Sequence, residues 1–162
     1  MAPDEVWIGP EGLFAATCLL AGDQTGGSFS VVQHLLAPGI LAAPPHRHRD
    51  EDEFSYVVEG VVAFQLENEV QTASAGAIVS KPKGQMHTFW NPSQGPARIL
   101  ELITPPGFED YFTELADIVP KTPGEVPDFG RLSEAAGRHG LEFDMDSLGS
   151  LMAAQGVRLP GM

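Results

Sequence analysis

Short apolar or alternating runs, each broken within a few residues by glycine, proline, asparagine or aspartate, fill the chain from Phe14 to about Thr104. Such runs predict half-buried strands, and the breakers predict the turns between them. The 18 Gly and 14 Pro of the 162 residues exceed average usage, which supports a large number of turns. The predicted strands are residues 14–20, 28–36, 53–58, 61–67, 77–80, 88–91 and 97–104. Short strands at this spacing predict an all-β domain built as one barrel or sandwich.

The apolar period changes after Gly107, where large side chains recur at helical spacing. This pattern predicts a helix over 108–119 and a second short helix that begins after Asp128 and stops at Gly140. The tail 144–162 carries weak signals and receives no assignment. We therefore divide the chain into an N-terminal arm (1–13), a barrel (14–104) and a C-terminal helical extension of the same domain (105–162).

Charge and cysteine content limit the partners and the compartment. Nine Lys and Arg against 22 Asp and Glu give a net charge of −13, and the basic residues are scattered. Such a chain repels phosphate backbones and anionic lipid, so we expect no nucleic-acid or membrane partner. The single cysteine, Cys18, cannot form an internal disulfide, and we interpret it as a small buried hydrophobe. The first residues carry no basic and apolar leader, so we expect a soluble, cytoplasmic protein.

Two histidines separated by one residue, His46 and His48, precede the strand that starts at Glu53. On extended chain, positions i and i+2 point to the same face, so both imidazoles can meet one ion. Farther along, a tight turn at residues 82–84 precedes His87 and directs it back toward the barrel. Three imidazoles and a carboxylate suit Fe, Mn, Ni, Co, Cu or Zn, and the residue types do not choose among them.

These two segments resemble the paired signatures of the cupin superfamily. The downstream segment has every fixed residue of its signature, namely Gly76, Pro82, Gly84, His87 and Asn91, and the upstream segment has His46, His48, Glu53 and Gly60 at the expected gaps. It departs only in having six residues, rather than five, between Gly39 and His46. The resemblance implies a double-stranded β-helix, or jelly-roll barrel, that binds one divalent transition metal through His46, His48, Glu53 and His87.

Strand alternation extends the candidate site beyond the ligands. If Glu53 points inward, so do Ser55 and Val57, and Phe89 follows His87 into the cavity. We predict that these three side chains line a substrate pocket, although Val57 and Phe89 fit equally well as core filling. We interpret His34 as a hydrogen-bonded barrel histidine and His139 as a structural residue in the last turn of a helix.

Phe54, Tyr56 and Val58 then form an outward apolar row. Either the helices or a second subunit must cover such a row, and we expect a homodimer.

The resemblance extends more loosely to quercetin-dioxygenase-like cupins of a single domain. It implies a mononuclear dioxygenase acting on a small enolisable or phenolic compound, with Glu53 as the base that removes the substrate's hydroxyl proton. Because one fold supports several chemistries, two alternatives stay open. One is a metal-dependent isomerase or decarboxylase, and the other is a non-enzymic module that binds or senses a small molecule.

Overall fold

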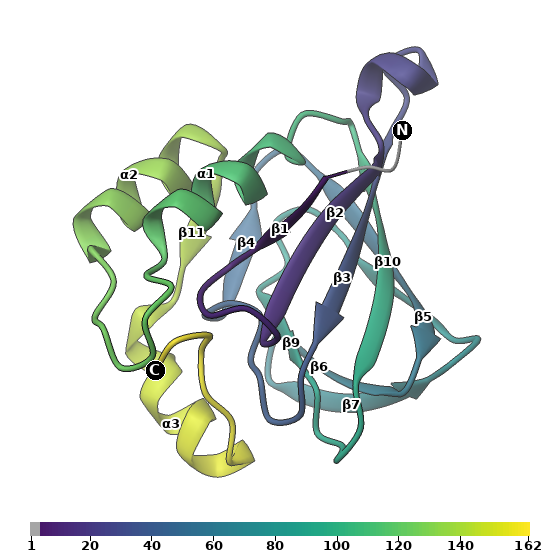
Figure 1. Ribbon diagram of the computed structural model, residues 1–162. Coiled ribbons are helices and arrows are strands. Elements are labelled where there is room, and N and C mark those ends of the chain that lie inside the picture. Colours follow the sequence, from purple (N-terminus) through teal and green to yellow (C-terminus); the bar gives the residue numbers. More distant parts are fainter. Residues whose placement is uncertain (1–3) are drawn as a thin grey trace.

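The computed structural model describes residues 4–162, in which two antiparallel sheets enclose a common core (Figure 1). The six-stranded sheet has, in spatial order, β1 (Glu5–Trp7), β2 (Phe14–Leu20), β3 (Ser30–Leu36), β10 (Ala97–Thr104), β5 (Asp52–Glu59) and β8 (Ile78–Lys81). The five-stranded sheet has β11 (Leu141–Phe143), β4 (His46–His48), β9 (His87–Trp90), β6 (Val61–Leu66) and β7 (Glu69–Ser74). The predicted all-β jelly-roll fold is confirmed.

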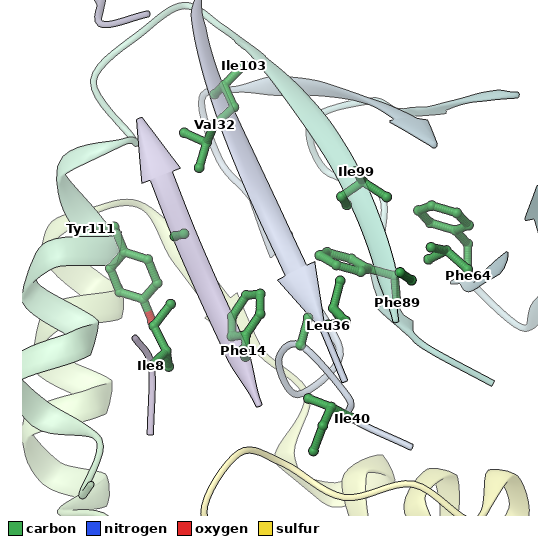
Figure 2. Close-up of a cluster of buried hydrophobic side chains, with 14 of the residues drawn as sticks. Ile8, Phe14, Val32, Leu36, Ile40, Phe64, Phe89, Ile99, Ile103 and Tyr111 are labelled. Carbon is green, nitrogen blue, oxygen red and sulfur yellow. The ribbon is translucent and has the colours of Figure 1, made fainter. Parts of the chain in front are cut away.

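Alternating side chains of both sheets form the core. Along β3, buried and half-buried residues alternate without exception, and β10 repeats the pattern in register with it. Figure 2 shows Ile99 of β10 close to Phe89 of the opposite sheet, with Phe64 beyond it, and all three side chains are buried. Because side chains alternate between the two faces of a strand, every second residue of β3 and β10 points into the core. The same alternation decides which polar side chains point inward.

The turn between β5 and β6 carries the chain from one sheet to the other at Gly60. This glycine has φ +76°, and a Cβ built on it would lie 2.5 Å from the carbonyl oxygen of Pro96. A side chain there would be excluded by both the backbone angle and the space. Near the same loop, Asn91 donates hydrogen bonds to the carbonyl oxygens of Leu36 and Gly95, which ties the ends of β3 and β9 to the segment that precedes β10.

The C-terminal extension contains three helices: α1 (Asp110–Ile118), α2 (Phe129–Arg138) and α3 (Met145–Gln155). The first two correspond to the predicted pair, and Asp128 caps α2 as expected by accepting a hydrogen bond from the amide of Arg131. The extension thus has one helix more than predicted. Figure 1 places α1 and α2 together beside the strands, with α3 apart from them.

Several short elements have no counterpart in the predicted set. They are β1 in the N-terminal arm, β4, β7, β11, α3 and the short 3-10 helix at Gly22–Thr25. Strand β1 pairs with β2, and β11 pairs with β4, so the N-terminal arm and the C-terminal extension each add a strand to a sheet. Over residues 4–162, none of the helices combines the length and apolar character needed to cross a bilayer.

Candidate metal centre

Three buried histidines from two neighbouring strands meet inside the barrel. His46 and His48 point inward from β4, while Arg47 between them is exposed and pairs with Glu142 of β11. His87 opens β9 and pairs in register with His46. One ring nitrogen from each of the three imidazoles lies within 4.8 Å of the others. The structure therefore brings together the three predicted histidines.

The turn at residues 82–84 holds these strands in place. The amide of Gly84 donates to the carbonyl oxygen of His48 at 2.8 Å, and the amide of Gln85 donates to Pro82 at 3.1 Å. Gly84 has φ +81°, a conformation that other residues rarely adopt. The turn thus positions His87 beside His48.

The outer ring nitrogens of two histidines are bound to the backbone. Nδ1 of His46 lies 2.8 Å from the carbonyl oxygen of Pro44, and Nδ1 of His87 lies 3.0 Å from that of Gln85. A carbonyl oxygen requires Nδ1 to carry the proton, so that Nε2 carries the lone pair. Nε2 of His48 and His87 are buried and lack hydrogen-bond partners among the described residues. Such orphaned nitrogens are what a metal ion would satisfy.

Glu53 of β5 completes the cluster. Its Oε2 lies 3.3 Å from Nε2 of His87 and 3.4 Å from Nε2 of His48. The same oxygen contacts Nζ of Lys81, its register partner on β8, at 3.0 Å. Burial raises the pKa of Glu53, but the charges of His48 and Lys81 outweigh it and hold that pKa well below its usual range. Glu53 is therefore ionised, as a ligand or a base requires.

The pKa values of the histidines differ with their surroundings. Burial lowers the pKa of both His46 and His87, which keeps these imidazoles neutral and able to bind a cation. Burial also lowers the pKa of His48, but the carboxylates of Glu53 and Glu51 outweigh it and raise that pKa to about 9. A divalent transition metal would displace the proton of His48, and the nitrogen and oxygen donors together then fit such an ion.

Lys81 and Glu101 form a buried charged pair next to the cluster. Lys81 Nζ lies 2.8 Å from Oε2 of Glu101, and neither side chain is more than 1% exposed. Ser55 donates its hydroxyl to the same carboxylate at 2.9 Å. Burial raises the pKa of Glu101 to about 7 even though Lys81 opposes the shift. One ammonium group thus stands between two buried carboxyls, those of Glu53 and Glu101.

A cavity of about 540 Å³ opens onto the cluster, within the range typical of small-molecule sites. His46, His48, Glu53 and Glu101 contribute to its wall. Most of the remaining wall is apolar and comes from the C-terminal extension, including Phe108, Tyr111, Phe112, Phe129, Leu132 and Phe143. The C-terminal extension therefore builds most of the apolar wall of the cavity.

The other residues singled out in the sequence have different surroundings. Of the three side chains predicted to line the pocket, Phe89 lines the cavity. Ser55 and Val57 point to the interior but do not line the cavity. Ser55 is bonded to Glu101, and Val57 packs in the core. Nε2 of His139 lies 2.9 Å from Glu114, which joins α2 to α1. Cys18 is a free, half-buried thiol.

Lys81, Glu101 and the cavity position of His34 were not predicted from the sequence. The sequence does indicate that Glu101 is buried. It lies two residues from both Ile99 and Ile103, so it shares the inner face of a strand that is otherwise apolar there. Lys81 carries no such signal, since it ends a four-residue strand beside Pro82.

Comparisons with known proteins bear on the family and the fold of the barrel. The sequence matches the family described as "Cupin domain" over residues 32–103. No protein of curated function shows significant sequence similarity.

Three solved structures illustrate the likeness in fold. KdgF from Halomonas sp. is 21% identical, with a TM-score of 0.56 over 64% of this chain and 87% of that one. A predicted oxalate decarboxylase from Thermotoga maritima is 20% identical, with a TM-score of 0.56 over 64% and 91%. A sugar phosphate isomerase from Silicibacter pomeroyi is 29% identical, with a TM-score of 0.50 over 56% and 59%.

Proposed function

The chain belongs to the cupin superfamily, and from that premise we propose that it is a metal-dependent enzyme of the dioxygenase type, acting on a small enolisable or phenolic compound. His46, His48, His87 and Glu53 would hold one divalent transition metal. When bound, such an ion lowers the pKa of a substrate hydroxyl and supplies the site for reaction with oxygen. The ionised carboxylate of Glu53 would accept the hydroxyl proton.

The main support for this proposal is the composition of the cavity wall. Of the described residues that line the cavity, none is Lys or Arg, and the wall away from the histidines is largely aromatic and aliphatic. The nearby ammonium of Lys81 is already occupied by two carboxylates. A phosphorylated sugar or a small dicarboxylate needs cationic partners, whereas a neutral aromatic compound gains from burial against such a wall. The wall also excludes water from the reacting groups.

Replacing Glu53 with glutamine tests its role as the base. We expect turnover to fall by about 100- to 10,000-fold, because the amide cannot accept the proton, while much of the metal is retained by the three histidines. Oxygen uptake by Fe-, Mn- or Ni-loaded protein on a panel of flavonols and catechols measures turnover, and elemental analysis measures metal content. Glu59→Gln, at the exposed end of the same strand, is the matched control.

Unchanged turnover in Glu53→Gln would rule out this base. Metal-dependent binding of the panel without turnover in the wild type, also on isomerase and decarboxylase substrates, would favour the binding module instead.

We also propose that the chain forms a homodimer through the outer face of β5 and β8. Tyr56 and Val58 are exposed there, and Ile78, the register partner of Tyr56, is 66% exposed. Helices α1 and α2 pack against β1 and β11, and α3 packs against Trp90, so this exposed apolar face is left for a second copy, which a two-fold axis can supply. Tyr56→Glu/Ile78→Glu should convert a dimer to a monomer in light scattering, while Val70→Glu on β7 should not. A monomeric wild type at high concentration would overturn the proposal.

A further inference from the structure

His34 lies in the cavity wall but outside the cluster of three histidines. It projects from β3 toward the interior, opposite Ile99 of β10, and is only 2% exposed. Its Nδ1 is buried and has no hydrogen-bond partner among residues 4–162. A buried polar atom without a partner costs about 1–3 kcal/mol, so its presence calls for a ligand that satisfies it.

The side chains around His34 are aromatic, and its one polar partner among the described residues is the backbone of Ala15. Its ring centroid lies 4.8 Å from that of Phe112, 5.2 Å from Phe14 and 6.0 Å from Phe89. Burial lowers the pKa of His34 to about 4, so the imidazole is neutral near pH 7. A neutral imidazole has one N–H donor and one lone pair, and because one of these is used by the backbone of Ala15, the other is left for a single polar group.

An aromatic wall joins His34 to the histidine cluster. Phe112 packs on Phe108 with centroids 5.5 Å apart, and Phe108 packs on His48 at 4.5 Å. All of these side chains line the same cavity. The cavity therefore has one polar region at the cluster and a second at His34, with phenylalanine rings along the wall between them.

We propose that His34 hydrogen-bonds a polar substituent of the substrate, and that the substrate is an aromatic compound with two polar groups, one for the histidine cluster and one for His34. This inference rests on the proposed function and makes it more specific. His34 would then select among aromatic substrates by the position of a hydroxyl or carbonyl group, because an unpaired imidazole penalises those that lack it.

Binding to zinc-loaded protein tests the proposal without any turnover. The probes are 3-hydroxyflavone and a series of its derivatives, each with one added hydroxyl group at a different position. We expect at least one derivative to bind the wild type about five- to tenfold more tightly than 3-hydroxyflavone, the gain typical of one hydrogen bond. His34→Phe, which keeps an aromatic ring, should abolish this preference, and His34→Gln should restore part of it.

Two results would overturn the inference. One is a preference for the added hydroxyl that is equal in wild type and His34→Phe, and the other is failure of the whole series to bind the wild type. Thermal unfolding verifies that the variants are folded. The imidazole ¹⁵N resonances of wild-type His34 provide an independent measurement, and should shift with the favoured derivative but not with 3-hydroxyflavone. If the series binds as expected but Fe-, Mn- and Ni-loaded protein takes up no oxygen, the dioxygenase proposal fails while the role of His34 stands.

Discussion

Replacing Lys81 with methionine is expected to lower the free energy of unfolding of the metal-free protein by about 3–5 kcal/mol, the usual cost of removing one partner from a buried ion pair. Methionine fills the space of the lysine stem but leaves Glu53 and Glu101 buried without the cation that contacts both. Urea denaturation at neutral pH measures the loss. Lys83→Met is the matched control, because Lys83 lies two residues away and is exposed.

The effect of Lys81→Met should depend on pH. Without the ammonium, burial raises the pKa of Glu101 still further above its unfolded value, because Lys81 is the group that opposes this shift. A raised folded pKa stabilises the protein at acidic pH, and this contribution is lost as pH rises through the folded value. The deficit should therefore be small under acidic conditions and grow toward neutral pH, and adding Glu101→Gln should recover part of it. A loss below about 1 kcal/mol, or one that does not vary with pH, would contradict this account.

The parts of the site that the sequence predicts are those fixed by local geometry. His46 and His48 share a face because β4 is extended, and His87 is placed by a tight turn whose proline and glycine are visible in the sequence. The alternation and the turn residues predict an all-β barrel or sandwich in the same way, whereas the jelly-roll topology is implied by the resemblance to cupins. The meeting of His87 with His46 depends in addition on the pairing of β4 with β9, and the resemblance to cupins implies it.

The parts that were missed depend on pairing between distant strands. Lys81 meets Glu53 and Glu101 only because β8, β5 and β10 are adjacent, an order that the sequence pattern does not contain. Strands β4 and β11 are three residues long, and each is defined by its partner. Helix α3 escaped prediction because it buries only Leu148 and Leu151, which is too little for a clear helical period.

Replacing His87 with alanine is expected to abolish stoichiometric metal binding. The variant removes one of the three nitrogen donors, and the carboxylate of Glu53 keeps its contacts with His48 and Lys81. We expect the affinity for Mn²⁺, Ni²⁺ or Zn²⁺ to fall by more than about 100-fold, beyond what loss of an outer hydrogen-bond partner causes. Isothermal titration calorimetry measures the affinity. Thermal unfolding gives a second readout, because metal at a hundred times its Kd should stabilise the wild type by about 2.7 kcal/mol and the variant by far less.

His139→Ala is the control for this variant, since His139 is bonded to Glu114 and lies outside the cluster. It should bind metal with the affinity of the wild type, because no cavity nitrogen is altered. If His87→Ala instead binds one equivalent of metal as tightly as the wild type, the ion is held elsewhere, and the assignment of Glu53 as the base next to it fails as well. If only His87→Ala loses the metal, the convergence of β4, β5 and β9 on one point inside the barrel is what creates the centre.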